Sequence, residues 1–162
     1  QAFAYQYKKP IATFRPFSVY GPYEQKDRLI PKIIQSLFTQ KPIQLTDGKQ
    51  RRDFIYVDDV VNAYIQSIIK GDKLRGKICN LGTGHEYTND EVVNILFRVA
   101  KAKVPVEKGA FLSRMWDSPH WVADISQTKK LLGWKPKFSL EKGLLKTYQW
   151  FLINKGLYET KK

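Results

Sequence analysis

The side chains best suited to chemistry in this sequence do not form a recognisable metal site. Cys79 is the single cysteine, and its apolar, strand-like surroundings favour a small buried hydrophobic residue over a nucleophile. His85 and His120 lack metal-ligand partners at a useful spacing. Asp58 and Asp59 could pair on a metal, but Asp58 precedes a helical pattern and is predicted to be its N-cap, with Asp59 facing the helix dipole. The sequence therefore predicts no metal site.

The basic charge points to a solvated surface or to a polyanionic ligand. Lysine and arginine number 28 against 15 acidic residues, which gives a formal charge of +13. Such an excess suits a nucleotide diphosphate or a nucleic acid. The lysines are scattered, however, and the sequence has no zinc-finger spacing, RNA-binding aromatic motif or dense basic arm. Nucleic-acid binding is kept as an alternative.

Length and composition favour a cytoplasmic globular domain. The 162 residues are enough for one domain with its own core. No apolar run approaches the roughly 20 residues needed to span a bilayer, and no signal peptide is visible. A lone cysteine cannot form an internal disulfide, which is compatible with a reducing compartment.

Helical and strand-like patterns alternate along the chain, which predicts an α/β fold. A capping-box pattern from Thr88 to Glu91 marks one helix start. Helices are expected near residues 1–7, 29–39, 59–69, 88–102, 126–133 and 140–154, and strands near residues 11–14, 43–45, 53–57, 77–81 and 104–107.

Four parts of the chain carry a family resemblance together, although each is weak alone. Their order and spacing resemble the extended short-chain dehydrogenase/reductase family, in its NAD-dependent epimerase/dehydratase branch, over about residues 1–152. The matching stretches are residues 15–22 (RPFSVYGP), 52–60 (RDFIYVDDV), 80–84 (NLGTG), and 123–126 (ADIS) followed by 131–136 (LLGWKP).

The resemblance implies a Rossmann domain with a smaller C-terminal substrate domain. The Gly-rich dinucleotide fingerprint of the family is absent, and Gly82 and Gly84 are interpreted as turn residues. Residues 1–162 are therefore interpreted as the C-terminal portion of such an enzyme, without its N-terminal NAD-binding half. This portion would contain late parallel strands, among them residues 11–14 and 77–81, and the small α/β substrate-binding domain.

The family's catalytic pair is Tyr-x-x-x-Lys, in which the lysine lowers the pKa of the tyrosine. Tyr5 and Lys9 have this spacing, but Lys9 lies only six residues before Arg15, much closer than the family's lysine lies to the same motif. We therefore expect no catalytic residue in this chain.

The resemblance also implies a set of ligand-binding residues. Arg52 and Arg114 correspond to arginines that bind the diphosphate of a nucleotide sugar, and arginine suits this role because its planar fork makes two charge-assisted hydrogen bonds. Asp117 falls where the family often contacts the ribose or base. Ser18 stands in place of a phosphate-binding asparagine, and Leu45 stands in place of an aromatic residue that stacks on the base.

Further contacts are expected near the motif at residues 15–22. Pro16 and Phe17 would lie by the nicotinamide of NAD, Tyr20 would lie near the sugar, and Leu29 is counted with the substrate-binding residues. A rigid turn and a packed aromatic residue remain structural alternatives for this segment.

The expected function is the nucleotide-sugar-binding portion of an NAD-dependent epimerase or dehydratase, inactive alone. Residues 114–124 resemble a subgroup close to lipopolysaccharide-sugar enzymes, including those that use CDP-sugars. The expected partners are a nucleotide-diphosphate sugar and the N-terminal half of the same enzyme. A stand-alone binding module is a further alternative. The reaction, the sugar, the base and a homodimeric parent protein stay open.

Overall fold

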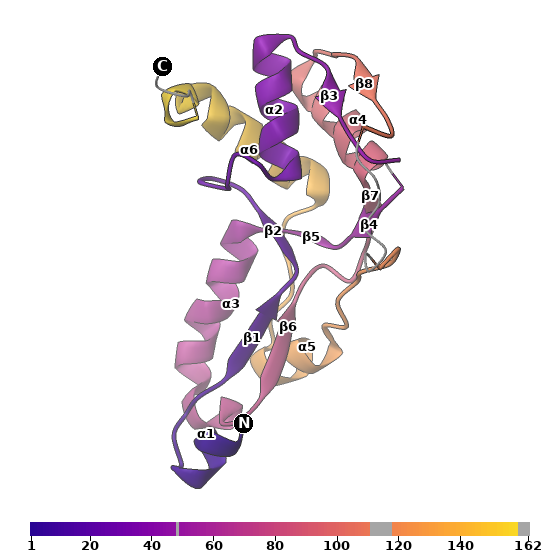
Figure 1. Cartoon of the computed structure of the whole chain (residues 1–162). Coiled ribbons are helices and arrows are strands. Elements are labelled where there is room, and N and C mark those ends of the chain that lie inside the picture. Colours follow the sequence, from indigo (N-terminus) through magenta and orange to yellow (C-terminus); the bar gives the residue numbers. More distant parts are fainter. Residues whose placement is uncertain (48, 111–117, 159–162) are drawn as a thin grey trace. The chain divides into compact units, whose positions relative to one another are not determined.

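The computed structural model describes residues 1–47, 49–110 and 118–158 (Figure 1). They belong to two compact units, each assembled from three stretches of chain. The first unit takes residues 1–19, 52–86 and 121–138, and the second takes residues 20–51, 87–120 and 139–162. Both units combine helices with a parallel strand pair, which confirms the predicted α/β class.

A parallel strand pair runs through the first unit, as predicted. Thr13 lies opposite Ile78 and Pro16 lies opposite Leu81 in this pair, formed by β1 and β6. Ile11 and Ala12 were expected in the strand but precede it. The elements of this unit are α1 (Ala2–Gln6), β1 (Thr13–Pro16), β5 (Phe54–Tyr56), α3 (Val57–Lys70), the short 3-10 helix η1 (Gly71–Leu74), β6 (Ile78–Leu81) and α5 (Ser126–Leu132).

The first unit has a core to which α3, α5 and β6 contribute. Trp134 is 1% exposed, and its indole N–H donates to the carbonyl oxygen of Asp59 at 3.1 Å. Cys79 is also buried, and this burial raises the pKa of its thiol, as expected for a hydrophobic packing role. The central cluster consists of Ile55, Val60, Ala63, Leu74, Leu81, Leu132 and Trp134.

The start of α3 differs from the prediction. The helix begins at Val57 and its N-cap is Tyr56, so the expectation that Asp58 caps it is wrong. Asp59 is 2% exposed, and its carboxylate accepts from the backbone N–H groups of Lys137 at 2.9 Å and Phe138 at 3.1 Å. Asp59 thus fixes the chain that follows Trp134.

The second unit contains a helical layer beside a short parallel pair. In that pair Ile43 of β3 lies opposite Val106 of β8, and α4 packs against both α2 and α6. The elements are α2 (Leu29–Thr39), β3 (Ile43–Gln44), β7 (Tyr87–Thr88), α4 (Asn89–Ala100), β8 (Val106–Glu107), α6 (Leu140–Ile153) and the short 3-10 helix η2 (Lys155–Leu157). The chain passes between units within β2 (Ser18–Tyr20) and β4 (Arg51–Arg52).

Local sequence accounts for the helices of the second unit. In α2 one apolar face is buried by Ile30, Ile33 and Leu37, as its spacing predicts. The predicted capping box is confirmed: Glu91 N–H donates to Thr88 Oγ1 at 3.1 Å, and Thr88 N–H donates to Glu91 Oε2 at 2.7 Å. These hydrogen bonds lower the pKa of the Glu91 carboxyl.

None of the helices in the described ranges is both long and apolar enough to cross a membrane.

Candidate functional site

A buried carboxylate organises one end of the first unit. Asp53 is fully buried, and its Oδ1 accepts from the N–H of Thr83 at 2.8 Å and from the Thr83 hydroxyl at 2.6 Å. Its Oδ2 accepts from the N–H groups of Gly84 at 3.0 Å and Ala123 at 3.1 Å. Four donors compensate the cost of burying the charge. Asp53 therefore ties together the motif that contains it, the turn after β6 and the chain before α5.

The turn after β6 needs glycine for two reasons. A Cβ on Gly82 would overlap both Ala123 Cβ and the Asp53 carboxylate. Gly84 has a φ of +78°, which side chains of L-residues rarely adopt. These glycines let the backbone approach Asp53, which agrees with their interpretation as turn residues.

Aromatic and cationic side chains gather around Asp53. The Asp53 N–H donates to the Trp121 carbonyl at 2.9 Å. The Trp121 ring lies 5.9 Å from the Arg52 guanidinium carbon and 6.4 Å from the Phe17 ring, which it meets edge to face. Phe17 is fixed in turn, because its N–H donates to the carbonyl of Leu81 at 2.9 Å. The arrangement combines a cation with two aromatic surfaces.

The structure brings four of the predicted site residues into this region of the first unit. Ser18 is half-buried, and its N–H donates to the Asp53 carbonyl at 3.0 Å. Pro16 ends β1 and is exposed. Phe17 and Arg52 contact the same Trp121 ring, and Pro16 precedes Phe17 at the end of β1. Such a surface can hold an anionic group at Arg52 beside an apolar or aromatic group.

Three other predicted site residues belong to the second unit. Tyr20 is 2% exposed, and its hydroxyl donates to the Leu140 carbonyl at 3.3 Å. A Cβ on Gly143 would overlap that hydroxyl, so Tyr20 also packs closely against α6. Leu45 is buried, whereas Leu29 is half-buried at the start of α2. These contacts explain Tyr20 and Leu45 as packing residues, and their ligand contacts stay predictions.

Arg114 and Asp117 lie outside the residues that the structure describes. The expectation that Arg114 joins Arg52 at one anion site stays a prediction.

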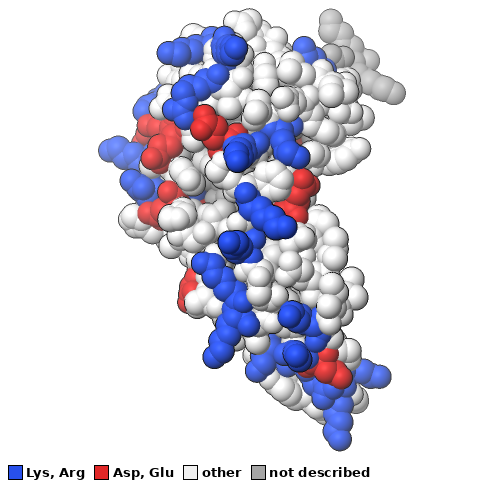
Figure 2. Space-filling model, turned by 180° about the vertical axis from the view of Figure 1, so that it is seen from behind, with Lys and Arg blue, Asp and Glu red and all other residues white. Residues whose placement is uncertain are grey.

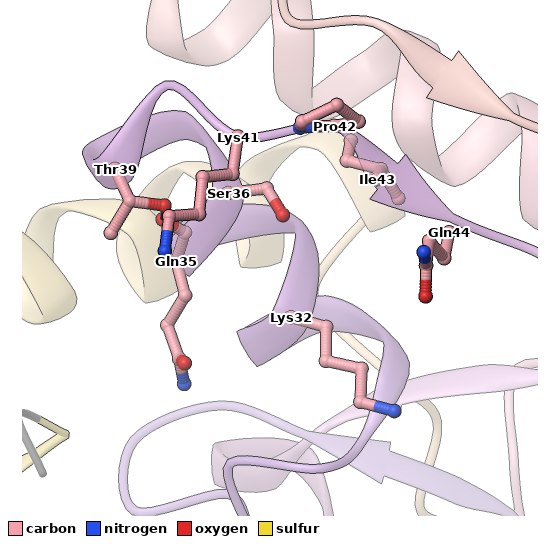
Figure 3. A pocket seen from close by; sticks show the side chains of 8 residues that line it. All are labelled: Lys32, Gln35, Ser36, Thr39, Lys41, Pro42, Ile43 and Gln44. Atoms are coloured by element: carbon pink, nitrogen blue, oxygen red, sulfur yellow. Dashed lines mark hydrogen bonds between the residues drawn. The ribbon is translucent and has the colours of Figure 1, made fainter.

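The second unit also has an open polar hollow of about 360 Å³ (Figure 3). Two lysines, Lys32 and Lys41, stand at its border, and Figure 3 shows it lined from α2 to β3. Of the predicted site residues that the structure describes, none lines it. The described residues that line it are Lys32, Gln35, Ser36, Thr39, Lys41, Pro42, Ile43 and Gln44.

Glu24 is an unusual carboxyl in the second unit. Its side chain is 12% exposed and its Oε2 is buried without a hydrogen-bond partner. Burial raises its pKa to about 7, against the opposing effect of Arg28, which lies 3.9 Å away. Glu24 therefore titrates near neutrality.

Asp53 and Trp121, which organise this region, were not predicted from the sequence. Asp53 directly precedes the buried apolar residues of β5, and an acidic residue in that position is a signal for a paired, buried carboxylate. Its partners at positions 83, 84 and 123 are distant in sequence, so local pattern could not identify them.

Comparison with known proteins identifies the family of this chain. A sequence model of the "NAD dependent epimerase/dehydratase family" matches residues 1–82. The chain belongs to this family. The matched range includes Pro16, Arg52 and Asp53, and it ends at Gly82.

Curated relatives include enzymes that act on two kinds of nucleotide sugar. A UDP-glucuronate 4-epimerase of Thermodesulfobacterium geofontis is 37% identical over 146 residues, covering 89% of this chain and 44% of the relative. A dTDP-D-glucose 4,6-dehydratase of Mus musculus is 33% identical over 161 residues, covering 95% of this chain and 44% of the relative. The chain thus spans less than half the length of these relatives.

Solved structures with a similar fold are also about twice as long. An epimerase of Methanothermobacter thermautotrophicus has a TM-score of 0.87 at 28% identity, over 97% of this chain and 47% of its own. A UDP-glucuronic acid 4-epimerase of Bacillus cereus, in complex with UDP-glucuronic acid and NAD, has a TM-score of 0.83 at 26% identity, over 97% of this chain and 49% of its own. The shared fold is that of Rossmann-type epimerases and dehydratases.

Proposed function

We propose that this chain is the nucleotide-sugar-binding portion of an NAD-dependent nucleotide-sugar epimerase or dehydratase. The observation that carries the proposal is the contact of the Arg52 guanidinium and Phe17 with one Trp121 ring, next to the buried Asp53 whose carbonyl accepts from the Ser18 N–H. The relatives of this chain, which include a UDP-glucuronate 4-epimerase and a dTDP-D-glucose 4,6-dehydratase, support the same proposal.

Arg52 binds the diphosphate in this proposal. A guanidinium keeps its charge and presents N–H donors in a plane, which matches two phosphate oxygens. Ser18, whose backbone N–H donates to the Asp53 carbonyl, donates its hydroxyl to the same group in this proposal. Arg114 supplies the second positive charge, because one arginine in water gains little from pairing with a diphosphate.

NAD fits the end of β1. Pro16 and Phe17 present apolar surfaces at the carboxyl end of this strand, and Phe17 is held by the Leu81 carbonyl. When bound, NAD would accept a hydride from a sugar carbon and return it. Pro16 and Phe17 would border the nicotinamide, while Arg52 would hold the diphosphate and so orient the sugar.

A second polypeptide segment, the N-terminal half of the parent enzyme, supplies the catalytic tyrosine and lysine in this proposal. One support is length, since the relatives are more than twice as long as the matched part. A second is the exposed apolar face of α3, because such faces usually mark contact surfaces. This face carries Val61, Tyr64, Ile65, Ile68 and Ile69, which are 47–80% exposed in the first unit.

Tyr5 has a packing role that needs no catalysis. Its ring lies against Gly76, where an added Cβ would come within 2.5 Å of Tyr5 Cε2. The N-terminal Gln1 side chain donates to the Gly76 carbonyl at 2.9 Å, so α1 is anchored at the same turn. We therefore propose that Tyr5 and Lys9 serve structure. We also propose that the parent protein is cytoplasmic, with which the single cysteine of this chain is compatible.

Calorimetry with UDP, dTDP and CDP tests the proposed function. We expect one or more of these nucleotides to bind, and Arg52→Ala and Arg114→Ala each to weaken binding by about tenfold, or about 1.4 kcal/mol. Lys130→Ala is a matched control, since it removes an exposed charge from α5. If none of the nucleotides binds, or if the arginine variants bind like the control, the proposal is wrong.

Nucleic-acid binding is the alternative function, and binding assays with RNA or DNA distinguish it from nucleotide-sugar binding. Lysines and arginines spread over the face in Figure 2 with acidic residues among them. Tight RNA or DNA binding with a steep dependence on salt, together with no nucleotide binding, would replace the proposed function.

A further inference from the structure

Trp121 holds a large aromatic ring at the surface of the first unit on a firmly fixed backbone. Trp121 is 52% exposed. Its carbonyl accepts from the Asp53 N–H at 2.9 Å, and two residues later Ala123 N–H donates to Asp53 Oδ2 at 3.1 Å. The same buried residue therefore fixes the chain at Trp121 and again two residues after it. Because half of the ring remains in solvent, core packing alone does not explain a tryptophan here.

The Trp121 ring contacts one cationic and one aromatic side chain, and these contacts indicate its role. The Arg52 guanidinium carbon lies over the ring at 5.9 Å, and Phe17 meets the same ring edge to face at 6.4 Å. A guanidinium is attracted to the face of an indole, and tryptophan is the strongest of the aromatic side chains in this contact. Contact through the flat face is compatible with hydrogen bonds made in the guanidinium plane.

Restricting Arg52 matters because arginine has many rotamers. A free arginine side chain loses considerable entropy when it binds an anion in one geometry. A ring that already limits its positions reduces that loss at the moment of binding. The main chain of Arg52 is equally restricted, since the next residue is the buried Asp53.

We propose that Trp121 is a positioning residue that holds the Arg52 guanidinium for a diphosphate-bearing ligand. This inference rests on the proposed function and adds a specific determinant of affinity to it. Trp121 acts through Arg52, so its contribution depends on the arginine and on the diphosphate, and it is independent of the base.

A double-mutant cycle on the native protein tests the inference, with UDP and inorganic pyrophosphate as probes in calorimetry. We expect Trp121→Leu to weaken binding of both probes about two- to fivefold, the range of an exposed cation–π contact. In the Arg52→Ala background the same change should have no further effect. Val122→Ala, an exposed neighbour in the same segment, is the control and should bind like the wild type.

An aromatic series keeps the test decisive if Trp121→Leu does not fold. Trp121→Tyr and Trp121→Phe retain a ring, and affinity should decrease from tryptophan to the weaker rings. Affinity that does not depend on the ring overturns the inference.

The outcomes separate the inference from the function on which it rests. A loss that persists in the Arg52→Ala background, or that appears with UDP and not with pyrophosphate, overturns positioning through Arg52. If Arg52→Ala weakens binding while Trp121→Leu does not, the inference fails and the proposed function stands. If UDP and pyrophosphate do not bind the wild type, or Arg52→Ala binds them unchanged, the proposed function itself fails.

Discussion

Asp53→Asn is the substitution that most directly probes the construction of the site. It preserves the shape of the side chain, but it removes the charge and turns one acceptor oxygen into a donor NH₂ group. At present Oδ1 faces the N–H and hydroxyl of Thr83, and Oδ2 faces the N–H groups of Gly84 and Ala123. An asparagine can satisfy only one of these two sides with its oxygen.

The expected loss of stability in Asp53→Asn is estimated from the more favourable of the two orientations of the asparagine amide. With the oxygen toward Gly84 and Ala123, the NH₂ group faces the Thr83 hydroxyl, which can accept, and the Thr83 N–H, which cannot. One buried N–H then loses its partner, at about 1–3 kcal/mol, and the remaining hydrogen bonds lose their charge assistance. We expect the free energy of unfolding to fall by about 2–4 kcal/mol.

Urea unfolding monitored by circular dichroism measures this change, with an unaltered m-value as the check on two-state behaviour. Asp58→Asn is the matched control, because Asp58 is exposed in the same motif, and it should change stability by less than about 0.5 kcal/mol. A loss below about 1 kcal/mol for Asp53→Asn would refute the role assigned to the buried carboxylate.

Two further predictions concern the rest of the chain. The raised pKa of Glu24, about 7 against 4.5, means that the folded state binds the proton more tightly, so stability should fall as pH rises from about 4.5 to 7. The free energy of unfolding should fall by up to about 3 kcal/mol over this pH range. Denaturant unfolding at several pH values measures this fall, and Glu24→Gln should abolish it. A pH dependence that is the same in Glu24→Gln as in the wild type would contradict the prediction. The isolated chain should turn over no UDP-sugar with added NAD, and Tyr5→Phe should leave the turnover of the whole enzyme nearly unchanged; a loss of turnover as large as that of a catalytic-residue variant would overturn the structural role of Tyr5.

Elements governed by local sequence were predictable. The helix expected at residues 29–39 has those bounds in the structure, because its apolar spacing and Pro31 in the first turn agree. The capping box at Thr88 was predictable for the same reason, since both hydrogen bonds form within four residues.

The roles of side chains that hydrogen-bond to residues far away in the sequence were not predictable. Asp58 has the residue type and position of an N-cap, yet α3 starts one residue before it. Asp59 binds the backbone of Lys137 and Phe138, and Asp53 binds residues from two other segments. Family resemblance identified Arg52, but nothing local to Arg52 indicated the Trp121 ring beside it.

A structure of the native protein with UDP bound tests the central claim most directly. Our account predicts diphosphate oxygens within about 2.7–3.2 Å of the Arg52 guanidinium nitrogens, with Trp121 still in contact with the same guanidinium. The hollow bordered by Lys32 and Lys41 is the competing position for an anion. A diphosphate bound there, with Arg52 in contact with none of its oxygens, would contradict the account.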